Sequence, residues 1–169
     1  MTLSDATLAR FAKEVAKYPQ EQAQSAVMAC LSIVQQEQGW VSAESEAAVA
    51  AYLGMAPMAV HEVTSFYNMY NQQPVGKYKL NVCTNLPCQL RDGQKALERL
   101  CQALGVEDGG TTADGLVTVA KCECLGACAD APVMLVNDRQ MLSYMNNDKL
   151  DELVTMIKSE AASSNNGAA

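Results

Sequence analysis

Four cysteines in two short groups are the residues of this sequence best suited to chemistry. Cys83 and Cys88 form a Cys-x4-Cys motif, and Cys124 and Cys128 form a Cys-x3-Cys motif. Two such pairs supply four thiolates, which is enough for a [2Fe–2S] cluster with two thiolates on each iron. The motifs therefore predict a metal centre, and the chemistry that such a centre offers is the transfer of single electrons.

Other uses of four cysteines have to be weighed against a cluster. Zinc ribbons usually use Cys-x2-Cys hairpins, which this sequence lacks, whereas the plant-type ferredoxin loop also opens with Cys-x4-Cys. A thioredoxin-type dithiol would need a Cys-x-x-Cys motif, which is absent too. Free cysteines are also often plain core residues. The spacing favours a cluster and leaves structural zinc and buried thiols as alternatives.

The remaining cysteines and the only histidine are expected to have other roles. Cys30 and Cys101 lie on apolar stripes of predicted helices and are expected in the core. Cys122 is a rival to Cys124, because on a continuing strand it would share that residue's face. We favour Cys124 with Cys128, since Gly126 between them lets backbone amides approach the sulfurs. His61 is expected on a helix surface.

Composition limits the class of protein and its partners. The chain has 169 residues, 49% of them hydrophobic, and a formal charge of −7 without any basic run. An apolar fraction of this size supports a packed core, and the charge argues against nucleic acid or anionic lipid as partners. The longest uncharged stretch has 15 residues, too short to cross a bilayer. With no leader pattern at the N-terminus, we expect a cytosolic protein whose thiols stay reduced.

The first part of the chain, residues 1–70, is predicted to be helical. Apolar residues recur at helical spacing over residues 4–18, 21–38, 43–53 and 57–66, with Ser4 as a cap and Gly39 and Gly54 as stops. Residues 71–76 carry Pro74 and Gly76 and are predicted to be a linker.

The second part, residues 77–160, is predicted to be an α/β domain. It has strand patterns from Tyr78 and over 116–122, 133–136 and 141–144. Helices are predicted around 96–104 and from a cap at Asn147. The order is β-α-β and then β-β-α, the order of the thioredoxin core. Both cysteine pairs fall just after strands, where loops on a rigid sheet often hold sites. Residues 161–169 are predicted to be a disordered tail.

Missing motifs also carry information. No Gly-x-Gly-x-x-Gly or Walker loop occurs, so the chain is not expected to bind a nucleotide itself, and no catalytic residues are predicted. An electron carrier without a nucleotide site needs a partner that has one.

The cysteine motifs, with Leu125–Gly126–Ala127 between the second pair and Ala131–Pro132–Val133 after it, resemble a known family. The chain is similar to the small thioredoxin-like [2Fe–2S] subunit of bacterial NADH-quinone oxidoreductase, which belongs to the NADH-oxidising (NADH dehydrogenase) module of respiratory complex I. The resemblance runs from about Leu8 to Ile157 and includes the upstream stretches QQEQGWVS and VHEVTSFYNMY.

The resemblance implies a fold, a ligand set and partners. The fold is a partner-wrapping helical region followed by a thioredoxin-like domain, and the ligands are Cys83, Cys88, Cys124 and Cys128. The cluster would exchange single electrons with FMN on a larger subunit that binds NADH and a [4Fe–4S] cluster, with a larger iron–sulfur subunit as a second partner. The complex reduces quinone in the respiratory chain and translocates protons, and this subunit is peripheral, on the cytoplasmic side of a bacterial inner membrane.

Two other functions stay open at this point. One is the equivalent diaphorase subunit of an NAD-linked hydrogenase or formate dehydrogenase. The other, from a different class, is a zinc-stabilised scaffold that only binds a partner.

Overall fold

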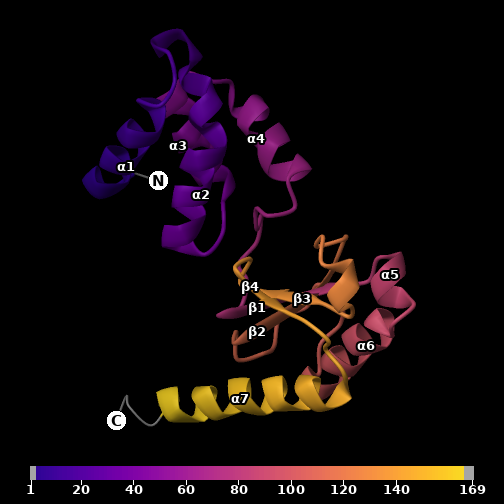
Figure 1. Cartoon of the computed structure of the whole chain (residues 1–169). Helices are drawn as coiled ribbons and strands as arrows, with labels where there is room; N and C mark the ends of the chain where they lie inside the picture. Colours follow the sequence, from indigo (N-terminus) through magenta and orange to yellow (C-terminus); the bar gives the residue numbers. More distant parts are fainter. Residues whose placement is uncertain (1–2, 166–169) are drawn as a thin grey trace. The chain divides into compact units, whose positions relative to one another are not determined.

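The structure, a computed structural model, describes residues 3–165 and shows two compact units that divide between Pro74 and Val75 (Figure 1). The first unit is helical and the second contains the sheet and both cysteine motifs. Each unit has a hydrophobic core of its own. No helix within residues 3–165 is both long and apolar enough to cross a membrane.

The helical unit contains four α-helices and one 3-10 helix: α1 Asp5–Val15, η1 Gln20–Ala26, α2 Val27–Gln38, α3 Ala43–Leu53 and α4 Pro57–Phe66. Ser4 caps α1 as predicted, because its side chain accepts a hydrogen bond from the backbone N–H of Thr7. Gly39 and Gly54 end α2 and α3 in the left-handed conformation that glycine adopts without strain.

The prediction of one helix over residues 21–38 is wrong in its first part. Residues 20–26 form a 3-10 helix, and Gln22 has non-helical backbone angles. Of these residues only Ala26 is buried, so the segment has too few apolar side chains to hold an α-helical stripe against the core.

The second unit holds a four-stranded sheet. Its elements are β1 Tyr78–Cys83, α5 Leu86–Gln89, α6 Gly93–Leu104, β2 Val117–Cys122, η2 Cys128–Asp130, β3 Met134–Val136, β4 Gln140–Leu142 and α7 Asn147–Asn165. The strand order is β2-β1-β3-β4, with β1 parallel to β2 and antiparallel to β3, and β3 antiparallel to β4. This is the predicted β-α-β followed by β-β-α, so the α/β fold class is confirmed.

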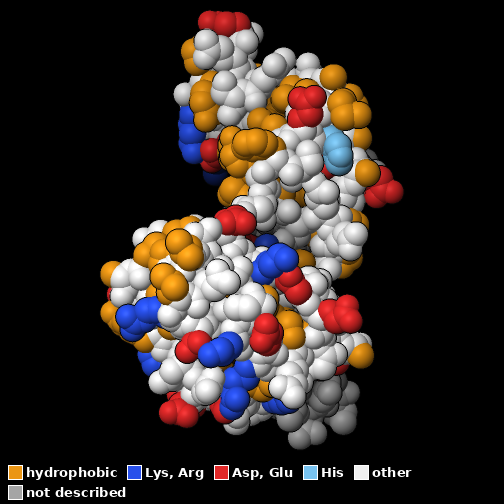
Figure 2. Space-filling view, turned by 90° about the vertical axis from the view of Figure 1, so that its right-hand side faces the viewer, with side chains coloured by type: hydrophobic (Ala, Val, Ile, Leu, Met, Phe, Trp, Pro, Cys, Tyr) orange, Lys and Arg blue, Asp and Glu red, His pale blue; other side chains and the backbone are white. Residues whose placement is uncertain are grey.

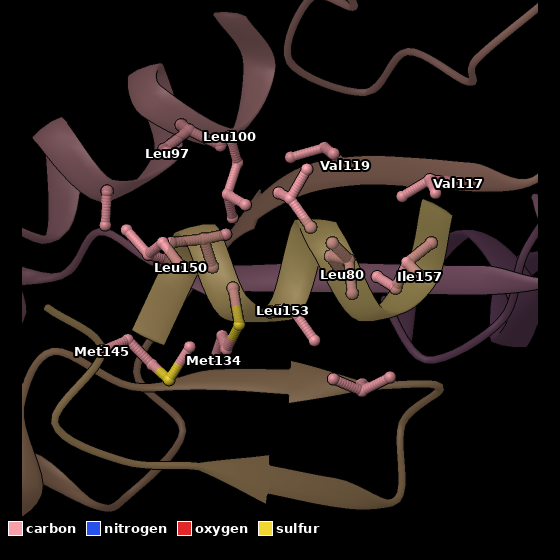
Figure 3. Packing of buried hydrophobic residues seen from close by; sticks show 14 residues of the cluster. Leu80, Leu97, Leu100, Val117, Val119, Met134, Met145, Leu150, Leu153 and Ile157 are labelled. Atoms are coloured by element: carbon pink, nitrogen blue, oxygen red, sulfur yellow. The ribbon is translucent and has the colours of Figure 1, made fainter. Parts of the chain in front are cut away.

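Both long helices of this unit pack against one face of the sheet (Figure 3). Leu80 from β1 and Val119 from β2, the two parallel strands, point into this main core, as the two-residue period of a strand requires. Leu100 comes from α6, and Leu150 and Ile157 come from α7. All five side chains are fully or almost fully buried, so truncating Ile157 or any of the three leucines to alanine would cost about 2–5 kcal/mol.

The C-terminal half departs from the sequence-based expectations in a few places. The short helix α5 was not predicted, and β4 covers residues 140–142 rather than 141–144. Asn146 caps α7 instead of Asn147, since its side chain accepts the N–H of Lys149 at 3.0 Å. Helix α7 continues to Asn165, so residues 161–165 of the predicted tail over 161–169 belong to this helix. Residues 166–169 of that tail lie outside the described part of the chain.

Candidate metal centre

The two cysteine loops leave the sheet side by side because β1 and β2 are parallel neighbours. Cys83, the last residue of β1, lies opposite Cys122, the last residue of β2. Beyond the strands the loops stay connected: the N–H of Thr84 donates to the carbonyl oxygen of Cys122 at 3.3 Å. The side-chain amide of Asn85 donates to the carboxylate of Glu123 at 2.9 Å. The sheet therefore brings both motifs, far apart in sequence, to one edge.

Cys83 and Cys88 form the buried half of the site. Each is 1% exposed, and with Ala131 and Val133 they make a small core separate from the main one. The N–H of Cys83 donates to the carbonyl of Val133 at 3.1 Å, and the backbone of Val133 hydrogen-bonds the sulfur of Cys88. Burial raises the pKa of Cys88, while this hydrogen bond acts in the opposite direction.

Cys88 is held in place by the short helix α5. Asn85 caps this helix through a hydrogen bond from the N–H of Leu86 at 3.0 Å, and Pro87 occupies its first turn. The turn folds the chain back after β1, so Cys88 becomes buried against Cys83 instead of facing solvent.

Cys124 and Cys128 form the exposed half, and their sulfur atoms lie 3.4 Å apart. Gly126 between them has a left-handed backbone (φ +79°), and its N–H lies 3.4 Å from the Cys124 sulfur, which confirms the predicted role of this glycine. That amide lowers the pKa of Cys124, and the hydrogen bond with Cys124 raises the pKa of Cys128. Two thiolates on one tetrahedral metal at about 2.3 Å lie roughly 3.8 Å apart, so this spacing suits a shared metal atom.

The two halves belong to one site. Cys128 is close enough to Cys83 and Cys88 for their charges to interact. The four sulfurs are arranged as two pairs, which matches the demand of a two-iron group for two thiolates at each iron.

Cys122 lies beside the site but differs from the four predicted ligands. It is half-buried against the small core of Cys83 and Cys88, and burial raises the pKa of its thiol to about 12. The strand ends at Cys122, so Cys124 does not continue on the same strand face.

The other cysteines and the histidine have different surroundings. Cys30 is fully buried in the helical unit, and Cys101 is half-buried against the main core, which confirms their structural roles. His61 also belongs to the helical unit, where its Nδ1 lies 3.0 Å from a carboxylate oxygen of the buried Glu46.

One contact at the site has no signal in the sequence. The hydroxyl of Tyr144 donates to the Asp130 carboxylate at 2.7 Å, and the N–H of Tyr144 donates to the carbonyl of Asp130 at 2.8 Å. Tyr144 has φ +54°, a left-handed conformation that bulky residues rarely adopt, so no pattern could have predicted it. Asp130 ends the 3-10 turn that begins at Cys128, so Tyr144 ties the exposed half of the site to the start of α7.

Comparison with known proteins agrees with this geometry. The family model for thioredoxin-like [2Fe–2S] ferredoxins matches residues 11–158. This chain belongs to the thioredoxin-like [2Fe–2S] ferredoxin family. The family match spans both units and all four cysteines, and it confirms the thioredoxin-like fold and the [2Fe–2S] cofactor that the sequence predicts.

Relatives in this family come from bacteria and from a eukaryote. NADH-quinone oxidoreductase subunit 2 of Thermus thermophilus is 40% identical over 143 residues, which cover 85% of this chain and 79% of the relative. A NADH-quinone oxidoreductase subunit of Rickettsia prowazekii is 36% identical over 148 residues, covering 86% and 82%. The mitochondrial NADH dehydrogenase [ubiquinone] flavoprotein 2 of Dictyostelium discoideum is 40% identical, and the match covers 78% of this chain and 53% of that longer protein.

Among solved structures, a chain of an NAD⁺-reducing [NiFe]-hydrogenase has the same fold as this family member. In its air-oxidised state the TM-score is 0.70 with 22% identity, covering 80% of this chain. The H2-reduced state gives a TM-score of 0.69. This chain spans only about a fifth of the hydrogenase chain, 23% in the air-oxidised structure, so the likeness concerns the fold.

Proposed function

We propose that this chain is the [2Fe–2S] electron-transfer subunit of an NADH:quinone oxidoreductase, the counterpart of the NADH-quinone oxidoreductase subunits among its relatives. The observation that carries the proposal is the meeting of two cysteine pairs at one edge of the sheet, in a chain whose family is defined by such a cofactor. The subunit has no catalytic site of its own, and its part in the enzyme is to hold and position an electron carrier.

The ligands in this proposal are Cys83 and Cys88 on one iron and Cys124 and Cys128 on the other. Once bound, the cluster supplies the ability to take up and release one electron at a time. The protein contributes the surroundings of the sulfurs. Ala131 and Val133 exclude water from the buried pair, and the backbone amide of Gly126 stabilises charge on the exposed pair.

The partner that we propose is the larger subunit that carries FMN, the NADH site and a [4Fe–4S] cluster, with the larger iron–sulfur subunit as a second contact. Apolar side chains beside the cysteine site support a docking surface there: Leu86 is 63% exposed and Leu90 is 78% exposed, on either side of Cys88. The exposure of Cys124 and Cys128 gives a partner direct access to the same end of the unit.

The helical unit is proposed to bind the same partner complex. It carries exposed apolar side chains on and after α4, including Met58 at 65% and Phe66 at 79% exposed. Hydrophobic groups at the surface of this unit, which contains the pale-blue histidine, are visible in Figure 2. Residues 1–70 would thus serve assembly and residues 77–160 electron transfer. The complex would lie at the cytoplasmic face of a bacterial inner membrane, with this subunit peripheral.

Purification of the tagged full-length chain from its own host tests this function. We expect an FMN- and NADH-binding protein to co-purify, together with quinone-reductase activity. A hydrogenase or formate dehydrogenase in its place would assign the chain to a diaphorase instead. A colourless chain that contains stoichiometric zinc would contradict electron transfer and support the scaffold alternative.

A further inference from the structure

Gly93, the first residue of α6, lies directly against the backbone of both buried cysteines. A Cβ atom added to this buried glycine would stand 2.8 Å from the carbonyl oxygens of both Cys83 and Cys88. It would also lie 2.9 Å from the carbonyl carbon of Cys88. All three atoms belong to the backbone, so they cannot swing aside as the end of a flexible side chain could.

The backbone conformation of Gly93 does not explain why a glycine is present. Its φ is outside the left-handed region, in contrast to Gly105 at the other end of α6 (φ +67°), whose added Cβ would meet nothing within 4 Å. Alanine is the better helix former at an ordinary helical position. The close approach to the backbone of the two cysteines therefore explains why position 93 is a glycine.

Helix α6 is not free to move away from the cysteines. Ala96, Leu97 and Leu100 on its inner face are buried in the main core, so any retreat of the helix would open that core. On the other side, the carbonyl of Cys88 accepts the N–H of Arg91 at 3.0 Å in the turn that leads into α6. A side chain at position 93 would thus displace the segment from Cys83 to Cys88 rather than the helix.

We propose that Gly93 is a positioning residue for the cluster: its missing side chain lets α6 rest on the backbone of Cys83 and Cys88 and so fixes the separation of their sulfurs. This inference rests on the proposed ligand set. It assigns a role in metal binding to a residue that contributes no ligand atom and makes no contact through a side chain.

Comparison of full-length Gly93→Ala with full-length Gly105→Ala tests the proposal. Both variants add one methyl group at an end of α6, but only the first meets the cysteines. We expect both chains to keep the far-ultraviolet circular dichroism of the wild type. Gly105→Ala should keep its iron content, its reduced-state paramagnetic spectrum and its midpoint potential. Gly93→Ala should lose iron or show a shifted spectrum and potential.

A second measurement needs no bound cluster and separates this inference from the proposed function. In the metal-free chain, Gly93→Ala should raise the alkylation rate of Cys83 and Cys88 by on the order of tenfold, through easier local opening, and leave Cys124 unchanged. A wild-type chain that binds no cluster would contradict the proposed function, while this labelling difference would still support the positioning of the two thiols.

Three results would overturn the role of Gly93. One is a Gly93→Ala chain with wild-type iron content, spectrum and potential. Another is unchanged labelling of Cys83 and Cys88. The third is a Gly93→Ala chain that no longer folds, because this would assign the glycine to the stability of the whole unit instead of to the site.

Discussion

The buried and the exposed cysteine pair are held by different physical means. Cys83 and Cys88 are fixed by packing: they end a central strand and sit on a capped helical turn within a small apolar core. Cys124 and Cys128 lie in a loop shaped by the left-handed Gly126 and by hydrogen bonds, and both are exposed. The difference indicates that one half of the site insulates the cofactor while the other half can face a partner.

Replacing Cys83, a buried cysteine that we propose as a ligand, should give the largest effect. Cys83→Ser is expected to weaken cluster binding by more than about 100-fold. Removing a ligand should cost more than removing a residue that only hydrogen-bonds to a ligand. Iron and sulfide content of the purified variant measures this. Cys101→Ser is the control, because Cys101 packs against the main core and should keep the cluster. Loss of the cluster in the control instead would show that the ligand set is wrong.

The two pairs should also differ in reactivity in the metal-free protein. Cys124 is exposed and its pKa is lowered by the amide of Gly126, whereas Cys88 is buried and its pKa is raised by burial. A lower pKa means that more thiolate is present at neutral pH. We expect iodoacetamide to label Cys124 on the order of tenfold faster than Cys88. Equal rates, measured by mass spectrometry, would mean that packing does not distinguish the pairs.

Removing a hydrogen bond beside the exposed cysteine pair should have a smaller effect on the site. Tyr144→Phe removes the hydroxyl that donates to Asp130, two residues after Cys128, and is expected to speed labelling of Cys128 roughly twofold to fivefold. Tyr70→Phe is a matched control in the helical unit, where the Tyr70 hydroxyl donates to the carbonyl of Met28 at 2.9 Å. Tyr70→Phe should lower the free energy of unfolding by about 1 kcal/mol without changing the labelling rate of Cys128. Similar labelling of Cys128 in both variants would exclude a role for Tyr144 at the site.

Replacing Cys122, the cysteine beside the four proposed ligands, should change the cluster least. Cys122→Ser is expected to keep the cluster with an unchanged reduced-state spectrum, since Cys122 is the last residue of β2 and packs beside the proposed ligands. Electron paramagnetic resonance is the measurement. A loss of signal comparable to that of Cys83→Ser would make Cys122 a ligand in place of Cys124.

The fold could be predicted from sequence where strong local signals coincide. Helices α3 and α4 have the predicted bounds, because Gly54 and Pro57 punctuate clear apolar stripes. The order of strands and helices along the chain followed from alternation and helical periodicity. The 3-10 helix η1 and the short helix α5 were missed, since a few polar or proline-containing residues give no period to read.

The sequence predicts which residue types form the site, but it does not predict that one cysteine pair is buried and the other is exposed. Cysteine spacing points to four ligands, and Gly126 behaves as its position suggests. Burial of one pair depends on Ala131 and Val133, which follow the second pair and reach the first only through the pairing of β3 with β1. Such a contact between segments distant in sequence cannot be read from either motif alone.

Electron paramagnetic resonance of the reduced full-length chain would detect the proposed cluster itself. We expect a signal that integrates to about one unpaired electron per chain, from a [2Fe–2S] cluster held by Cys83, Cys88, Cys124 and Cys128. The signal should disappear in Cys83→Ser and persist in Cys101→Ser. A purified wild-type chain with no signal and with stoichiometric zinc would show that this protein does not carry electrons on an iron–sulfur cluster.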